Sequence, residues 1–172
     1  MTTPKAKLAD LALIAALCAG FTLGLTAPAS AGLDEGVAAY KRGDYAMALR
    51  EWRPLAKQGD AGAQYNLGLM YARGHGVPQD FAKALQWYRN AALQGDAQAQ
   101  HNLAIMYRNG EGVTQDYVQA YMWLNIAALK ARKRLSKRSR EKLRIIRDDF
   151  AKRMTPAQIS EAQKLAREWK PK

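Results

Sequence analysis

The chain repeats itself with a period of 36 residues, and this repeat limits how it can fold more than any other feature. Residues 61–93 and 97–129 share 17 identities in 33 positions. The same shift aligns 44–60 with 80–96, so an earlier and shorter unit begins near Leu33. Because one such unit cannot bury its own apolar face, we expect the units to stack into a solenoid with a continuous core.

Each unit is predicted to be a pair of helices. In the second unit Ala63, Leu67 and Tyr71 recur at helical spacing, and the turn Gly74-His75-Gly76 ends the first helix. Asp80 then provides an N-cap, because its carboxylate can accept from the free amides of the next helix. Aromatic and sulfur side chains recur at matched positions, which indicates packing between helices rather than a ligand site. These side chains are Trp87, Trp123, Met70 and Met106.

The linker of the second unit and a proline of the first unit lead to two further predictions. The first unit lacks the five residues His75 to Gln79, which join the helices of the second unit. His75 itself is expected to be a solvent-exposed loop residue. Pro54 falls inside the second helix of the first unit and is expected to kink or shorten it, because proline removes a backbone donor and clashes with the preceding turn.

The repeated pattern resembles the Sel-one-like repeat (SLR), a relative of the tetratricopeptide repeat, over roughly 33–130. The first unit, with Gly43-Asp44-Tyr45, looks more like a plain tetratricopeptide unit. The resemblance implies an all-α fold, an α-α superhelix of about three helix pairs, at about 33–60, 61–96 and 97–130. It also implies a non-enzymatic module that binds a protein or peptide in a concave groove. The residues that carry it are Ala63, Leu67, Gly68, Tyr71, Gly74, Gly76, Val77, Asp80, Ala84, Trp87, Ala91 and Ala92, with a second set 36 residues later.

Residues 1–31 are predicted to be a signal peptide. Lys5 and Lys7 precede an apolar run from Leu11 to Leu25, and Ala29-Ser30-Ala31 has the small residues of a cleavage site. Cleavage after Ala31 would make the protein periplasmic or secreted. The alternative is an uncleaved N-terminal inner-membrane anchor. Because the one cysteine, Cys18, leaves with this segment, the mature chain cannot form a disulfide framework or a cysteine zinc site.

Residues 131–172 are predicted to form a basic pair of capping helices that follows the repeats of residues 32–130. The first, about 136–153, has an apolar stripe of Leu143, Ile146, Phe150 and Met154. Thr155-Pro156-Ala157-Gln158 then has the pattern of a capping box with proline at the first helical position. The last helix is expected to bury Ile159, Ala162, Ala166 and Trp169. Similar endings are familiar from secreted bacterial proteins with this type of repeat.

The net charge of +12 is concentrated at this end of the chain. Residues 32–129 hold nine basic and nine acidic side chains, whereas 130–172 hold sixteen and five. This excess predicts an alternative function, binding of an anionic envelope component or another polyanion. Nucleic acid is disfavoured because no aromatic residue interrupts the basic run. The cluster comprises Lys130, Arg132, Lys133, Arg134, Lys137, Arg138, Arg140, Lys142 and Arg144.

No catalytic residues, metal site or cofactor are expected. The sequence has no G-x-S-x-G, H-E-x-x-H or paired-cysteine motif, and its two histidines lie in different units. We expect instead a groove lined by first-helix residues that face outward, where the repeated amides of Asn66 and Asn102 could bond an extended peptide or serve only the adjacent helix ends. The groove residues expected to bind an unidentified protein or peptide are Gln64, Tyr65, Asn66, Arg73, Gln100, His101, Asn102 and Arg108.

Overall fold

The computed structural model describes residues 29–131 and 137–171, with side chains placed for 32–129 and 144–171. This part of the chain contains only α-helices and the turns between them. The helices are α2 (Ala29–Lys41), α3 (Tyr45–Lys57), α4 (Ala61–Arg73), α5 (Phe81–Leu93), α6 (Ala97–Asn109), α7 (Tyr117–Ala131), α8 (Lys137–Ala151) and α9 (Pro156–Glu168).

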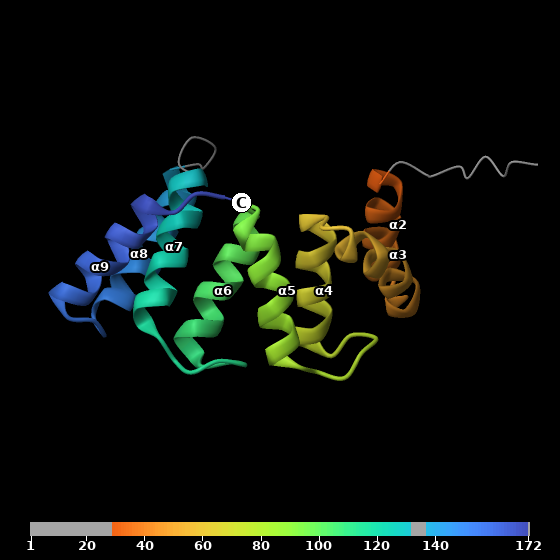
Figure 1. Cartoon of the computed structure of the whole chain (residues 1–172), viewed down its shortest axis with the longest axis horizontal. Coiled ribbons are helices and arrows are strands. Elements are labelled where there is room, and N and C mark those ends of the chain that lie inside the picture. Colours follow the sequence, from red (N-terminus) through yellow and green to blue (C-terminus); the bar gives the residue numbers. More distant parts are fainter. Residues whose placement is uncertain (1–28, 132–136, 172) are drawn as a thin grey trace, which may run out of the picture.

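The helices form one extended row, from α2 at one end to α8 and α9 at the other (Figure 1). The first six helices form three helical hairpins, which are α2 with α3, α4 with α5, and α6 with α7. Each hairpin also packs on the next one. Helix α7 contacts both α8 and α9, which close the row. The predicted α-α superhelix of helix pairs is therefore confirmed.

Aspartate side chains begin the helices at the positions that the repeat predicts. Asp80 accepts from the Lys83 amide at 2.9 Å, and Asp96 accepts from the Ala99 amide at 2.7 Å. Gly74 and Gly110 end α4 and α6 with φ values of 69° and 74°. Left-handed backbone of this kind is strained for a residue with a Cβ, so glycine is needed at this turn in both units.

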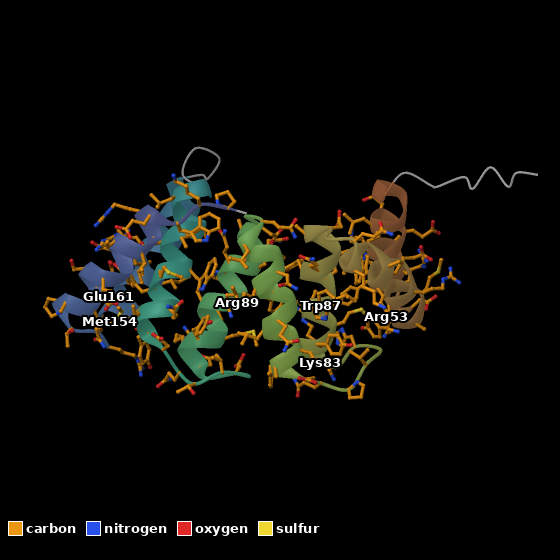
Figure 2. The ribbon with its side chains drawn as sticks, in the orientation of Figure 1. Arg53, Lys83, Trp87, Arg89, Met154 and Glu161 are labelled. Atoms are coloured by element: carbon orange, nitrogen blue, oxygen red, sulfur yellow. The ribbon has the colours of Figure 1, made fainter. Side chains whose placement is uncertain are left out.

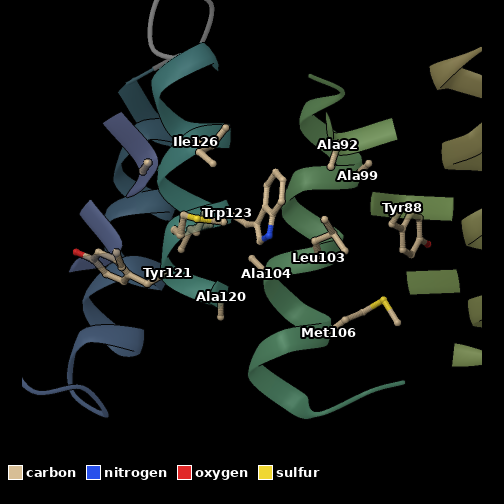
Figure 3. Close-up of a cluster of buried hydrophobic side chains, with 14 of the residues drawn as sticks. Tyr88, Ala92, Ala99, Leu103, Ala104, Met106, Ala120, Tyr121, Trp123 and Ile126 are labelled. Atoms are coloured by element: carbon tan, nitrogen blue, oxygen red, sulfur yellow. The ribbon is translucent and has the colours of Figure 1, made fainter. Parts of the chain in front are cut away.

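The core consists of two clusters along the row. The smaller one surrounds Trp52, which is 1% exposed, and includes Met70. The larger one runs from α5 to α9 and includes Met106 and Trp123, whose ring extends from α7 toward α6 (Figure 3). Trp87, labelled in Figure 2, is half-buried and packs against the smaller cluster. The recurring aromatic and methionine side chains therefore pack within and between units, as predicted.

A glycine of α4 faces a tyrosine of α5 in close contact. A Cβ placed on Gly68 would lie 2.6 Å from Cδ1 of Tyr88, which is closer than real Cβ contacts. In the third unit the equivalent residues are Ala104 and Leu124, both buried. A larger residue on one helix thus accompanies a smaller one on its partner, which keeps the helices in contact in both units.

The end of the row has the capping pair that the sequence predicts. Thr155 and Gln158 form a capping box, with Pro156 at the first position of α9. Phe150 of α8 is 1% exposed, and the ring centroids of Trp169 and Trp123 lie 6.2 Å apart. Helices α8 and α9 therefore cover the apolar side of α7. Leu143, the first residue of the predicted stripe, lies outside the residues whose side chains are described.

Of the two effects expected of Pro54, a kink or a shortened helix, the shortening is wrong. Helix α3 continues through Pro54 to Lys57 and has 13 residues, as α5 has. Pro54 removes the hydrogen bond to the Arg50 carbonyl, and its ring crowds that carbonyl, but neither effect ends the helix. Because Arg50 and Pro54 are both exposed, water can satisfy the Arg50 carbonyl.

Candidate functional site

A cleft of about 200 Å³ opens between α4 and α6, with side chains of α5 at its base. Helix α4 contributes Leu69 and Arg73, and α6 contributes Asn102 and Ile105. These positions lie on the sides of α4 and α6 that are turned away from the fully buried residues of each helix. The complete lining is Leu69, Ala72, Arg73, Phe81, Tyr88, Asn102, Ile105, Met106 and Glu111.

A polar group of two tyrosines and one amide lies at this cleft. The side chain of Asn102 lies close to both the Tyr65 and the Tyr88 hydroxyl, and the centroids of the two tyrosine rings are 5.8 Å apart. Burial is the main cause that raises the pKa of both phenols. Both hydroxyls are therefore neutral and able to donate hydrogen bonds at neutral pH.

The turn after α4 is fixed against the first unit by His75. The Tyr40 hydroxyl lies 2.9 Å from Nδ1 of His75, and the His75 ring stacks on Tyr45 with centroids 4.4 Å apart. Nη1 of Arg73 donates to the same Tyr40 oxygen at 3.2 Å. The expectation that His75 is solvent-exposed is wrong, because its ring is half-buried between two aromatic residues of the preceding unit.

Gln64 and Gln100 do not face outward as predicted, since they are 6% and 0% exposed. Nε2 of Gln64 donates to the Ala56 carbonyl at 3.1 Å, and Nε2 of Gln100 donates to the Ala92 carbonyl at 3.1 Å. Both acceptors lie in the last turn of the preceding helix, where carbonyl groups lack partners within the helix. These two amides join consecutive units and are not part of a binding surface.

The other predicted groove residues divide into three groups. Arg73 and Asn102 line the cleft. Tyr65 is not part of the lining, but its hydroxyl lies close to the side chain of Asn102. Asn66 and His101 are half-buried and are not part of the cleft lining. For His101, burial is the main cause that lowers the pKa, and the charge of Arg108 lowers it further.

Arg108 lies one helical turn beyond the cleft and belongs to a second one. Its guanidinium carbon lies 5.3 Å from the centre of the Phe150 ring, in the capping helix α8. In the repeat it is equivalent to Ala72, and Arg73 is equivalent to Asn109. The two arginines predicted to flank one groove therefore occupy different registers and different surroundings.

The sequence did not identify the apolar wall of the cleft. Leu69 and Ile105 are equivalent in the repeat and both are half-buried on opposite sides of the opening. Their signal in the sequence is an aliphatic residue repeated on the side of the helix opposite to Ala63 and Leu67. The spacing alone does not separate such a residue from one in the core.

The basic cluster lies almost entirely outside the described side chains. Only Arg144 has a described position, where it is exposed and lies 3.6 Å from Asp148. Among the side chains that are described, no group of three His, Cys, Asp or Glu residues could hold a metal ion. None of the described helices is long and apolar enough to span a bilayer.

Comparison with known proteins agrees with this architecture. The Sel1 repeat family matches residues 61–96 and 97–131. A crystal structure of a protective antigen from uropathogenic Escherichia coli strains, described as displaying an SLR fold, superposes with a TM-score of 0.72 at 29% identity. That match covers 83% of this chain and 30% of the antigen.

A second solved structure, a Sel1 repeat protein from Oxalobacter formigenes, has a TM-score of 0.55 and 34% identity. It covers 58% of this chain, and this chain covers 39% of it, so the chain spans well under half the length of either relative. No curated protein matches the chain. Sel1 repeats generally mediate protein–protein interactions, and proteins with this fold are typically non-enzymatic scaffolds. Residues 61–131 are two Sel1 repeats, and the chain has the SLR fold of that family.

Proposed function

We propose that the protein is an exported, non-enzymatic scaffold that binds an extended segment of a partner protein in the cleft between α4 and α6. The observation that carries this proposal is the composition of the cleft wall. Leu69 and Ile105 present apolar surface on its two sides, while Arg73 and Asn102 present hydrogen-bonding groups beside them. A polypeptide offers the same combination of apolar side chains and backbone amides.

The size of the cleft favours a protein segment over a small-molecule substrate. Its volume of about 200 Å³ is below the roughly 300–1,000 Å³ typical of pockets that bury a small ligand. A shallow opening of this kind suits one or two side chains of a longer segment that continues along the neighbouring helices. The aliphatic pair Leu69 and Ile105 would contact these side chains, and burial of that apolar area would supply most of the affinity.

The polar residues of the cleft serve recognition better than catalysis. Arg73 already donates to Tyr40, and Asn102 is already a neighbour of two tyrosine hydroxyls. A catalytic base would need a titratable group poised near neutral pH, whereas burial raises the pKa of the Tyr88 phenol further above that range. We infer that these groups fix the shape of the cleft and orient a bound backbone.

Export is part of the proposal and is supported by the N-terminal sequence. Lys5 and Lys7, the apolar run Leu11–Leu25 and Ala29-Ser30-Ala31 follow the order of a signal peptide. Cleavage after Ala31 would leave a helix that begins at Gly32. Leu33 and the other core residues of α2 would remain in place.

Site-specific crosslinking in the cells that make the protein tests this function. A photoreactive amino acid replaces Leu69 or Ile105 in the cleft, and in matched controls it replaces Arg53 or Arg89. These controls are equivalent to each other in the repeat, exposed, and absent from the cleft lining (Figure 2). The proposal predicts one crosslinked partner from both cleft positions and not from the controls. Equal crosslinking from all four positions, or none from the cleft, would refute it.

A further inference from the structure

A second cleft, of about 450 Å³, lies where the third unit meets the capping helix α8. Its side chains come from the end of α6, the turn before α7 and the start of α7, and from the end of α8 and the turn after it. All of its lining residues are polar or aromatic: Arg108, Asn109, Gln115, Tyr117, Asp149 and Arg153. The peptide cleft between α4 and α6 shares none of these residues, so this second site is separate.

The two arginines of this cleft are held by aromatic rings. The guanidinium carbon of Arg108 lies 5.3 Å from the centre of the Phe150 ring, and Phe150 is fully buried. The guanidinium carbon of Arg153 lies 6.0 Å from the centre of the Tyr117 ring, and its Nη1 donates to the Tyr117 hydroxyl at 3.4 Å. Stacking on a ring orients the planar guanidinium while its other N–H groups remain available.

Both arginines have more N–H donors than the nearby described side chains have acceptors for them. Arg108 uses Nε to donate to Asn109 at 3.0 Å, which leaves its two terminal nitrogens. Among the described side chains neither Arg108 nor Arg153 forms an ion pair, although Asp149 lies one turn before Arg153. The Tyr117 oxygen accepts from Arg153, so its own hydrogen can be donated into the cleft.

The repeat does not account for these arginines. Nε2 of Gln115 donates to the Arg108 carbonyl at 2.7 Å, and the equivalent Gln79 donates to the Ala72 carbonyl at 2.9 Å. That bond is common to both units and stabilises the turn. The Arg108 side chain, by contrast, is equivalent to the methyl group of Ala72, and Arg153 lies outside the repeats. Folding of the unit therefore needs the glutamine but not the arginine.

We propose that Arg108 and Arg153 bind a carboxylate of an acidic peptide in this cleft. A guanidinium matches a carboxylate through two parallel N–H···O bonds, and Tyr117 can add a third donor. Two arginines and Asp149 give the cleft a net charge of +1, which one carboxylate neutralises. Phosphate is disfavoured because its charge of about −1.5 to −2 would be repelled by Asp149.

Titration of the isotope-labelled protein, purified from cells that express all 172 residues, tests this site by following the arginine Nε–H signals. One probe is N-acetyl-Ala-Ala-Ala-Glu-amide, with a side-chain carboxylate. Another is N-acetyl-tetra-alanine with a free C-terminus. The glutamine amide analogue and inorganic phosphate are the comparison probes. We expect at least one carboxylate probe to shift the signals of Arg108 and Arg153, and which of the two does so identifies the source of the carboxylate.

Three variants make the result specific. Arg153→Gln should lower the affinity for the carboxylate probe at least tenfold. Arg108→Lys should also lower this affinity, although the positive charge is kept, because lysine lacks the planar pair of donors. Asp149→Asn should raise the affinity for the carboxylate probe, because it removes a negative charge from the cleft. A purely structural role of these residues would not produce this increase. The proposal fails if no carboxylate probe binds, if the glutamine probe or phosphate binds equally well, or if Asp149→Asn has no effect. Circular dichroism confirms that each variant is folded, and Arg153 and Asp149 are exposed enough that both substitutions should be tolerated.

Discussion

Gln100 donates from Nε2 to the backbone carbonyl of Ala92 at 3.1 Å, and this bond repeats the one between Gln64 and Ala56. The two amides differ in whether the side-chain oxygen, Oε1, has a hydrogen-bond donor beside it. Oε1 of Gln64 accepts from Gln94 at 2.8 Å, whereas Oε1 of Gln100 is buried without a partner among the side chains that the structure describes. Buried polar atoms without partners oppose folding, so the contact of Gln100 with Ala92 should stabilise the fold less than the contact of Gln64 with Ala56.

The difference predicts unequal effects of the same substitution. Gln64→Leu removes hydrogen bonds of a fully partnered amide and should lower the free energy of unfolding by about 1–2 kcal/mol. Gln100→Leu loses one bond but also removes a buried oxygen that no described side chain serves, so its cost should be smaller. Urea denaturation of both variants measures the difference. A larger loss for Gln100→Leu would contradict the account of the two joints.

The contact of Gly68 with Tyr88 predicts a helix-favouring substitution that destabilises. Alanine favours a helix over glycine by about 1 kcal/mol, but the new Cβ would lie 2.6 Å from the Tyr88 ring. Overpacking of this kind costs about 1–3 kcal/mol, so Gly68→Ala should lower the urea midpoint. Adding Tyr88→Leu copies the Ala104 and Leu124 pair and should restore part of the loss. A Gly68→Ala protein as stable as the parent would contradict the predicted clash.

The environment of His101 predicts a dependence of stability on pH. Burial and Arg108 lower its pKa in the folded protein, whereas the unfolded chain has the ordinary value of about 6.5. Below that value the unfolded chain binds the proton first, so the free energy of unfolding falls as pH drops from about 6.5 through the lowered pKa. His101→Gln should reduce this fall between pH 7.5 and pH 5. An unchanged difference between these two pH values would rule out His101 as a contributor.

Export predicts a defined N-terminus for the mature protein. If residues 1–31 are removed, the protein recovered from the envelope or medium begins at Gly32 and has lost Cys18. Intact-mass measurement and N-terminal sequencing check both properties. Ala31→Arg should block cleavage, because the enzyme requires small residues before the cut. Recovery of the full chain from the cell interior would contradict export.

The sequence was sufficient for the architecture because the architecture depends on local signals that occur twice. Asp80 and Asp116 begin the equivalent helices α5 and α7, Gly74 and Gly110 end the equivalent helices α4 and α6, and Thr155 begins α9. Each signal acts within one turn of the chain and needs no knowledge of distant contacts. The helix pairs and the capping pair could therefore be predicted.

The site was harder to predict because its residues are determined by contacts between units. Gln64 and Asn66 have the same polarity and lie two positions apart. Only the position of Ala56, in the preceding helix, makes the first a buried joint. In the same way, only Tyr45 of the first unit converts His75 from a loop residue into a stacked one. A period within one sequence does not encode where the neighbouring unit places its free carbonyls and rings.

The central claim is that the cleft between α4 and α6 binds a protein partner, and one affinity comparison tests it directly. The partner captured by crosslinking is titrated against the parent, against Leu69→Ser with Ile105→Ser, and against Arg53→Ser with Arg89→Ser. We predict that the cleft pair weakens binding at least about tenfold, or about 1.4 kcal/mol, and that the control pair leaves it unchanged. Equal affinity of the parent and the folded cleft variant would contradict the claim.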